Sequence, residues 1–366
     1  DNFNLYQLKK EAIENSIYGV DIDIGAVEIA KLRLWLSLVV DKGFEFQQEK
    51  LLSEVWTFED LDIKEKIEKI GTPLKDWDVN INYGIKTGFN EAFIIDEKTR
   101  QKILNNCKTE EEKKRTEAII KPVLRGRDIK RYYYKWAGLY LIYIPWHFPL
   151  HKDKKINGVS MKAEYKFKKI YPSLYNYLFL YKDRLSKRNK AETNIRYEWY
   201  VLQRYASDYY DEFEKEKIVW TPVDSEYKFA YLPIEAYLLN SIFMITPKYE
   251  GNKFLKYLLA VLNSKLIRQY ITLGTNLSRE GVYAYGSKEK IEKLPIPKIP
   301  EEKQKPLIEL VDKILELTNR EDYEYRPDLQ EKVQQYSKQI DQLVYKLYNL
   351  TDEEIKRIER KLKNDK

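Results

Sequence analysis

The sequence predicts an α+β protein in which short strands and helices are mixed, followed by a helical C-terminal region. Strand-like runs of apolar and β-branched residues lie at 79–86, 91–96, 139–144, 197–203, 217–223 and 241–246. Helical patterns lie between them, near 97–120, 161–188 and 252–270. With 366 residues and 43% hydrophobic content, the chain can bury the cores of two or three compact units.

Residues 1–43 have the pattern of a single strand followed by a single helix. The run Ile17-Tyr18-Gly19-Val20-Asp21 is a short apolar strand that ends in an acid, and residues 26–38 carry apolar side chains at helical spacing. A strand that leads into a helix is one step of a parallel α/β sheet. The further strands of such a sheet do not follow, so this segment is expected to be a strand–helix remnant.

The rest of the chain divides into three expected regions: a charged helical connector at 44–76, a mixed region at 77–300 and a helical region at 301–366. Pro295, Pro297 and Pro300 exclude a continuous helix or a central strand and predict an extended exit from the mixed region.

Two apolar stripes at helical spacing predict a pair of packed helices in the C-terminal region. The first stripe comprises Leu307, Leu310, Val311, Ile314 and Leu317. The second comprises Leu329, Val333, Tyr336, Ile340, Leu343, Val344 and Leu347. A last, charged helix is expected to begin with the capping box Thr351-Asp352-Glu353-Glu354.

Composition restricts the classes of function. The net charge is +7, and 31 tyrosines provide flat rings with a polar tip, which suit surfaces that meet bases and sugars. A coding bias toward Lys, Asn, Ile and Tyr also explains this excess.

The single cysteine, Cys107, excludes an internal disulfide, and His147 and His151 lack further ligands at metal spacing, so no metal site is predicted. No apolar run reaches 18 residues, and the N-terminal residues lack a basic-then-apolar signal pattern, so a cytoplasmic protein without membrane contact is expected.

Two basic segments are candidates for nucleic-acid binding. Residues 121–136 combine six Lys or Arg with one acid and four aromatic side chains, and residues 151–190 carry twelve Lys or Arg against three acids. Cations pair with phosphates, arginine also binds guanine edges, and rings stack on bases. A solvated basic turn and an ordinary charged helix are the alternative interpretations.

A third candidate is the turn Tyr83-Gly84-Ile85-Lys86-Thr87-Gly88, followed by Phe89 and Asn90. Its glycines either supply backbone freedom or allow the polar side chains to approach DNA closely. The candidate DNA-binding residues of the three segments are Lys86, Thr87, Asn90, Arg125, Arg127, Lys130, Arg131, Lys162, Lys166 and Lys169.

The runs Gly-Ile-Lys-Thr-Gly at 84–88 and Leu-Arg-Gly-Arg-Asp-Ile at 124–129 resemble the TaqI-like DNA specificity domain. This domain belongs to N6-adenine DNA methyltransferases and to fused type II restriction–modification enzymes. The resemblance covers roughly residues 70–350, and segments such as Asn263-Ser264-Lys265 match it as scaffold. It implies a mixed α/β target-recognition domain that binds double-stranded DNA.

The strand–helix segment resembles the second conserved element of S-adenosylmethionine-dependent adenine methyltransferases. The resemblance implies that residues 1–43 are a remnant of a Rossmann-like methyltransferase sheet and that Asp21 matches the acid that binds the cofactor ribose. The family's glycine-rich loop and its Asn-Pro-Pro-aromatic element are absent, and no Asn-Pro dipeptide occurs in the chain. The chain is therefore expected to have no catalytic residues, to bind no S-adenosylmethionine by itself, and to bind DNA without methylating it.

Two other functions remain open. In the first, the chain is an assembly subunit whose C-terminal helices recruit a complete methyltransferase core or a second subunit. In the second, it is part of a nuclease. The nuclease is disfavoured because no Asp/Glu-x-Lys cluster stands on a convincing strand.

Overall fold

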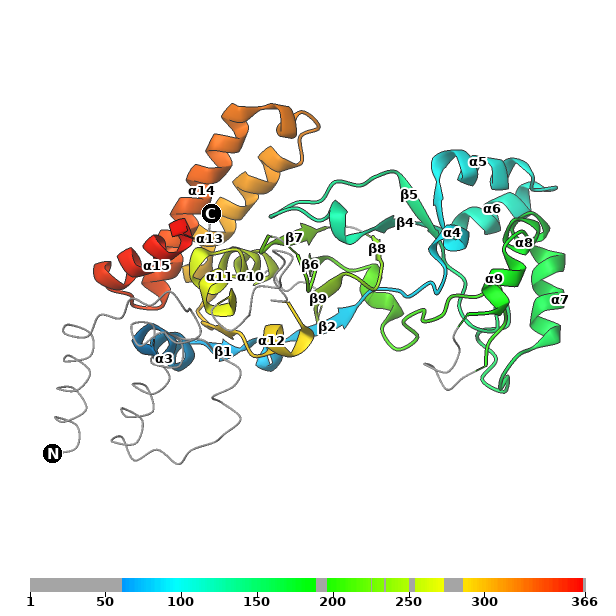
Figure 1. Cartoon of the computed structure of the whole chain (residues 1–366), viewed down its shortest axis with the longest axis horizontal. Helices are drawn as coiled ribbons and strands as arrows, with labels where there is room; N and C mark the ends of the chain where they lie inside the picture. The colour runs from blue at the N-terminus through cyan, green and yellow to red at the C-terminus, as the bar shows by residue number, and fades with distance from the viewer. Residues whose placement is uncertain are drawn as a thin grey trace, which may run out of the picture.

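The structure, a computed structural model, describes residues 61–188, 196–224, 226–233, 235–249, 254–272 and 286–364. The strand–helix unit predicted at 1–43, with Asp21, lies outside the described residues, and so do residues 44–60 of the predicted connector. The described part mixes helices with small sheets, which confirms the α+β class. Figure 1 shows an elongated arrangement, with the C-terminal helices toward one end and the helices of residues 97–186 toward the other.

A central antiparallel sheet separates two hydrophobic cores. Its strands lie in the order β2 (Val79–Tyr83), β9 (Phe243–Pro247), β6 (Lys217–Trp220) and β7 (Phe229–Leu232). Because successive side chains of a strand point to opposite faces, Ile218 and Trp220 enter one core while Val219 enters the other. All residues of β6 and β7 are buried, as expected for strands covered on both faces.

Core 1 lies on the face of Ile218 and Trp220 and is covered by helices. These helices are α3 (Leu61–Ile70), α10 (Phe254–Leu262), α11 (Lys265–Thr272), α12 (Lys288–Glu292), α13 (Glu301–Thr318), α14 (Pro327–Leu347) and α15 (Asp352–Asn364). Val311, Ile314, Ile340 and Val344 are buried in it, so the two predicted stripes do pack together. Core 1 therefore continues across the boundaries expected near residues 76 and 300.

Core 2 lies on the face of Val219 and contains a second sheet. The strand order is β3 (Ile94–Asp96), β5 (Leu139–Ile142), β4 (Ile120–Leu124) and β8 (Tyr237–Leu238). Neighbouring strands are antiparallel except β4 and β8, which are parallel. The helices of this half are α4 (Asn90–Phe93), α5 (Glu97–Asn105), α6 (Glu110–Ala118), α7 (Met161–Ile170), α8 (Pro172–Phe179) and α9 (Lys182–Ser186).

The predicted strand at 197–203 is wrong. These residues form turns and irregular backbone. Their side chains are nevertheless buried, and the aromatic rings among them pack against other rings. The Tyr200 ring stacks on Phe167 with centroids 4.5 Å apart, and the Tyr197 ring stacks on Trp146. The sequence patterns also miss strands β4, β7 and β8. Lys121 and Pro122 interrupt the apolar pattern of β4, and β8 has only two residues.

The ends of core 1 are joined by short contacts between distant segments. The prolines that predicted an extended exit include β10 (Pro295–Ile296), which pairs with β1 (Thr72–Pro73). Gly71 lies against this pair, and a Cβ on it would come within 2.3 Å of the Pro295 carbonyl, so only glycine fits there.

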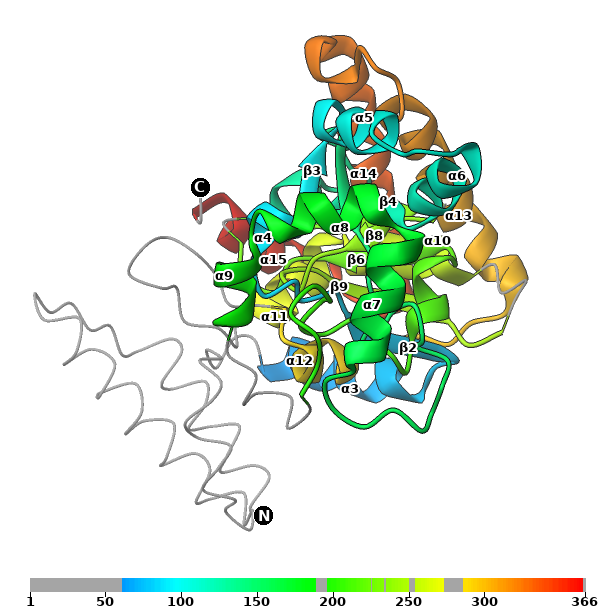
Figure 2. The same cartoon turned by 90° about the vertical axis from the view of Figure 1, so that its right-hand side faces the viewer.

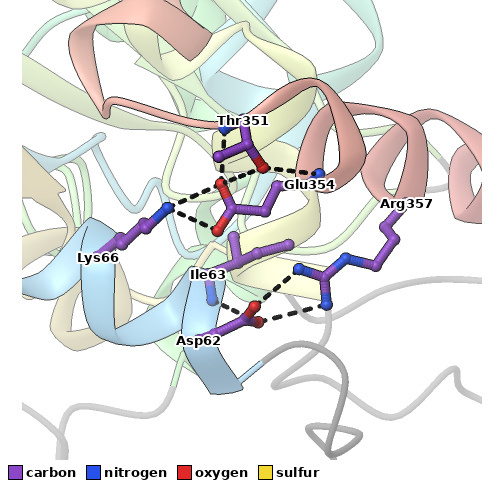
Figure 3. Close-up of polar contacts among 6 residues, drawn as sticks. All are labelled: Asp62, Ile63, Lys66, Thr351, Glu354 and Arg357. Carbon is purple, nitrogen blue, oxygen red and sulfur yellow. Dashed lines mark hydrogen bonds and ion pairs between the residues drawn. The ribbon is translucent and has the colours of Figure 1, made fainter.

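Helix α15 begins with the predicted capping box and is fastened to α3 (Figure 3). The Thr351 amide donates to Glu354 Oε2 over 2.7 Å, and the Glu354 amide donates to Thr351 Oγ1. Glu354 also accepts from Lys66 Nζ over 2.7 Å, and Arg357 Nη2 donates to Asp62 Oδ2 over 2.7 Å. The helix that follows residue 60 is therefore held by the last helix of the chain.

Candidate nucleic-acid interface

Strand β8 brings together the two motifs that suggested DNA recognition. On one side, Leu124 pairs with Leu238, and the Leu239 amide donates to the Leu124 carbonyl over 3.2 Å. On the other side, Ile85 pairs with Leu239 and donates its amide to the Leu238 carbonyl over 2.7 Å. Two inter-strand spacings amount to about 10 Å, so the 84–88 turn and the 124–129 loop are close neighbours.

The glycines of the 84–88 turn serve this packing. A Cβ on Gly84 would lie 2.2 Å from the Leu239 carbonyl oxygen, which explains why glycine stands where the turn meets β8. Gly88 has a φ of +79°, and a Cβ there would lie 2.6 Å from Gln203 Oε1. Backbone freedom and close packing are therefore sufficient reasons for both glycines.

The polar side chains of this turn have different surroundings. Thr87 is only 3% exposed, and its hydroxyl donates to Asn90 Oδ1 over 2.6 Å, so it orders the turn from inside the fold. Lys86 is half-buried, and its backbone pairs with Arg204 in an antiparallel bridge. Residues directly opposite in such a bridge project to the same face, so two cations lie side by side here.

A buried arginine that sequence reasoning missed holds the turn in place. Arg188 donates to the carbonyls of Thr87 (2.8 Å), Trp199 (2.6 Å) and Leu185 (3.0 Å). Its guanidinium also lies 5.5 Å from the centre of the Phe93 ring. Burial lowers the pKa of Arg188 to about 10, so it remains charged at neutral pH. Its segment is rich in lysine and arginine, and nothing in that local pattern distinguishes the one buried cation.

The 124–129 loop is closed by an ion pair. Asp128 is buried and accepts the Arg125 amide over 2.8 Å and two guanidinium nitrogens, Nη2 over 2.8 Å and Nε over 3.1 Å. Arg125 is therefore largely engaged within the loop. Arg127 is exposed at its tip and, among the described residues, makes no hydrogen bond or ion pair. Lys130 is half-buried at the exit of the loop.

Arg131 belongs to the scaffold. Its guanidinium Nη2 donates to the Asn263 carbonyl over 2.7 Å and to Ser337 Oγ of α14 over 2.9 Å. The side chain of Asn263 in turn bonds both the amide and the carbonyl of Phe229. The scaffold role expected for the Asn263 segment agrees with these contacts, and Arg131 joins the basic loop to the C-terminal helices.

The lysines of α7 lie apart from Arg131. Lys162 and Lys169 are exposed and Lys166 is half-buried. Figure 1 places α7 and α14 toward opposite ends of the long axis, and Figure 2 looks onto the end with α7, α8 and α9 toward the viewer. The ten candidate residues therefore do not form one patch. Lys86, Asn90, Arg125 and Arg127 gather near β8, while the α7 lysines form a second group.

The N-terminus of α7 is fixed by a buried carboxylate. Glu198 accepts the amides of His147 and Ser160, each over 2.9 Å, and His147 Nδ1 lies 3.0 Å from Glu198 Oε1. Ser160 then caps the helix by accepting the Ala163 amide. Tyr165 is 67% exposed on the same helix, so α7 presents an aromatic ring together with its cations.

Two acids near β8, Asp128 and Asp224, are paired within the protein. Besides Asp128, the Asp224 carboxylate accepts from Thr221 Oγ1 over 2.8 Å and lies 3.0 Å from Lys228 Nζ. Lys86, Arg204 and Arg127 all lie near β8, with Arg127 exposed and the other two half-buried. Over the residues that the structure describes, no three His, Cys, Asp or Glu side chains are grouped to hold a metal. None of the described helices is long and apolar enough to cross a membrane.

The described residues thus form a mixed α/β scaffold that carries cations around β8 and on α7. Two family models match parts of this chain. The model described as the TaqI-like C-terminal specificity domain matches residues 121–296, and that of the Eco57I restriction-modification methylase matches residues 15–132. Residues 121–296 are therefore similar to a TaqI-like C-terminal specificity domain, and residues 15–132 are similar to the Eco57I methylase family. The 84–88 motif falls in the range of the methylase model, whereas we expected it to open the specificity domain.

Individual proteins are similar to parts of this chain. The type II methyltransferase M.MjaIV of Methanocaldococcus jannaschii is 25% identical over 247 residues, which cover 67% of this chain and 74% of that protein. Two solved structures are similar at 12% identity: the type IIL restriction-modification enzyme MmeI in complex with DNA and the type IIG restriction endonuclease BpuSI. Their TM-scores are 0.48 and 0.41, and they match 76% and 80% of this chain. The chain spans about a third of each, 34% and 33%.

Proposed function

We propose that this chain binds double-stranded DNA and recognises its base sequence for an adenine-specific methyltransferase of a restriction–modification system. The observation that carries the proposal is the junction at β8, where the two motifs meet. Lys86 and Arg127 come from the motifs, and Arg204 lies opposite Lys86. Asp128 and Asp224 are paired with cations of the protein, so they do not oppose a polyanion as free charges. The match to a specificity domain supports the same function.

The test is binding of the purified chain to a random 30-base-pair duplex at several salt concentrations. A protein that neutralises phosphates shows a linear fall of log affinity with log salt, with a slope of about −0.9 per phosphate contact. Replacing Lys86 and Arg127 by Gln should reduce the steepness of this slope by about 2. The matched control replaces Lys332 and Lys338 of α14 by Gln and should leave the slope unchanged. Absence of salt-dependent binding by the unchanged protein would refute the proposal.

For the whole enzyme we propose the family reaction, methyl transfer from S-adenosylmethionine to adenine N6 after the base leaves the stack. The likeness of residues 15–132 to a methylase family supports it. Asp21 would hold the cofactor ribose, and it lies outside the described residues. Because no Asn-Pro dipeptide occurs in these 366 residues, we propose that the chain by itself neither binds the cofactor nor methylates DNA. Incorporation of labelled methyl groups into DNA by this chain alone would contradict that.

The alternative, recruitment of a separate catalytic chain through the C-terminal helices, is less favoured. The apolar faces of α13 and α14 are already buried in core 1 through side chains such as Val311 and Ile340. Deleting these helices would expose that core, so a loss of partner binding on truncation would not separate recruitment from unfolding.

A further inference from the structure

We propose that Asn240, in the turn after β8, binds an adenine edge in the major groove and is a specificity-determining residue of this domain. The inference rests on the proposed DNA-binding function and adds a residue that neither motif contains. The turn is closed by the Ile242 amide, which donates to the Leu239 carbonyl over 2.9 Å. It leaves Asn240 and Ser241 exposed between the two motifs.

Contacts on both sides fix the place of this turn. The Asn240 amide donates to the Ile85 carbonyl over 2.9 Å, so Asn240 lies next to Lys86. On the other side, a Cβ on Gly126 would lie 3.6 Å from Ser241 Oγ, so Ser241 lies next to Gly126, the residue that precedes Arg127. The two neutral polar side chains are thus flanked by a cation from each motif.

The hydrogen-bonding state of Asn240 distinguishes it from asparagines with structural roles. Asn80 donates to Glu212, Asn90 accepts from Thr87, and Asn263 bonds the Phe229 backbone. Within the described residues, the side-chain carboxamide of Asn240 has no such partner. It is held by its backbone, while its side-chain donor and acceptor are both available.

The chemistry of the amide selects the base. A carboxamide offers one acceptor and one donor side by side, which match the N6 amino group and N7 of adenine in the major groove. Flanking cations that bind phosphates set the register but carry no sequence information. In this arrangement the two cations would bind phosphates and position the duplex, and the neutral amide between them would recognise the base.

The experiment selects bound sequences from a random duplex pool and then measures affinity for the selected site and for its single-base variants. The sequences selected by the unchanged protein should have an A·T pair at one position. The Asn240→Ala variant should show no preference for A·T at that position. The preference at that position should fall by about 5- to 150-fold, as expected for one bidentate contact. Affinity for unselected DNA and its salt slope should remain the same. Asn319→Ala, the same change at the exposed end of α13, serves as the matched control.

The outcomes separate the inference from the proposed function. If the unchanged protein binds DNA but Asn240→Ala selects the same sequence with the same affinity ratio, the inference is wrong and DNA binding stands. A position that changes from G·C rather than from A·T overturns the adenine assignment. If the unchanged protein binds no duplex, both proposals fail. Asn240→Asp gives a second readout, since a carboxylate accepts from cytosine N4 and should shift the preference toward C at that position.

Discussion

At the residue scale, burial decides which cations are available to a ligand. Arg188 and Arg131 donate hydrogen bonds to backbone carbonyls, and Arg131 also donates to a serine hydroxyl. Arg127, in contrast, is exposed on a loop in which Asp128 is paired with Arg125. Lys217 is the extreme case, because its side chain is fully buried in β6 and donates to the Phe213 carbonyl over 2.9 Å. The donors of these cations are used within the fold, so these side chains are not candidates for binding a ligand.

Lys217 should make stability depend on pH. Burial lowers its pKa to about 8, below the ordinary 10.5, so between these values the unfolded chain binds more protons at this site. The free energy of unfolding should therefore rise by about 2 kcal/mol from pH 8 to pH 10. Above pH 10 buried tyrosines oppose this, because burial raises the pKa of groups such as Tyr257 and their ionisation favours unfolding.

Chemical denaturation of the unchanged protein and of Lys217→Met at several pH values measures this effect. Methionine has similar length and no charge, so the variant should lose the rise between pH 8 and pH 10. An equal rise in both proteins would assign the pH dependence to other groups.

At the scale of elements, short contacts between distant segments hold the fold together. The 84–88 turn can reach β8 only because Gly84 has no side chain. Helix α15 can hold α3 because Glu354 closes its own capping box and also accepts Lys66. Each contact joins segments that are far apart in the sequence.

Gly84→Ala should destabilise the protein more than Gly138→Ala. The added methyl at Gly84 meets two backbone carbonyls within 2.5 Å, which requires a backbone shift worth about 3 kcal/mol. Gly138 has a φ of +68°, but no described atom lies within 4 Å of the added methyl, so strain of about 1 kcal/mol is expected. Urea denaturation compares the two. A similar loss in both variants would mean that the turn moves away from β8 at little cost.

Glu354→Ala should lower the free energy of unfolding by about 1–2 kcal/mol, because it removes a helix cap and an ion pair together. Lys66→Gln should cost less than about 1 kcal/mol, since Lys66 remains partly exposed. In the double variant the Lys66 change should add nothing further, because its partner is already absent. Full additivity in urea denaturation would show that the two side chains act independently.

For the whole molecule, the two groups of cations would set the extent of the proposed DNA surface. The residues around β8 lie between the two ends, and the α7 lysines lie toward the end remote from α14 (Figure 1). A duplex that follows both groups would contact more phosphates than one that meets β8 alone.

Replacing Lys162, Lys166 and Lys169 together by Gln tests whether the duplex reaches α7. If it does, the salt slope should become less steep by up to about 3, with the selected base sequence unchanged, because phosphate contacts carry no sequence information. The matched variant changes Lys332, Lys338 and Lys346, which are exposed on α14, and should keep the original slope. An unchanged slope in the α7 variant would limit the interface to the region of β8.

Much of the local structure follows from the sequence alone. The apolar stripes of α13 and α14, the capping box of α15, and strands β2, β6 and β9 lie where side-chain periodicity and turn residues predict them, because these signals act within a few residues. The glycines of the 84–88 turn and the basic loop are also visible as local patterns.

Only the tertiary structure decides which of these residues form a site. Leu124 and Leu238 must pair before the two motifs meet, and the register of strands over 100 residues apart leaves no local pattern in the sequence. Arg125, Arg131 and Arg188 look alike in the sequence, yet their partners come from Asp128, α14 and the 84–88 turn. The exposure and hydrogen bonding of each polar side chain depend on those long-range contacts. Asn240 lies between the two motifs only because β8 pairs with both of them.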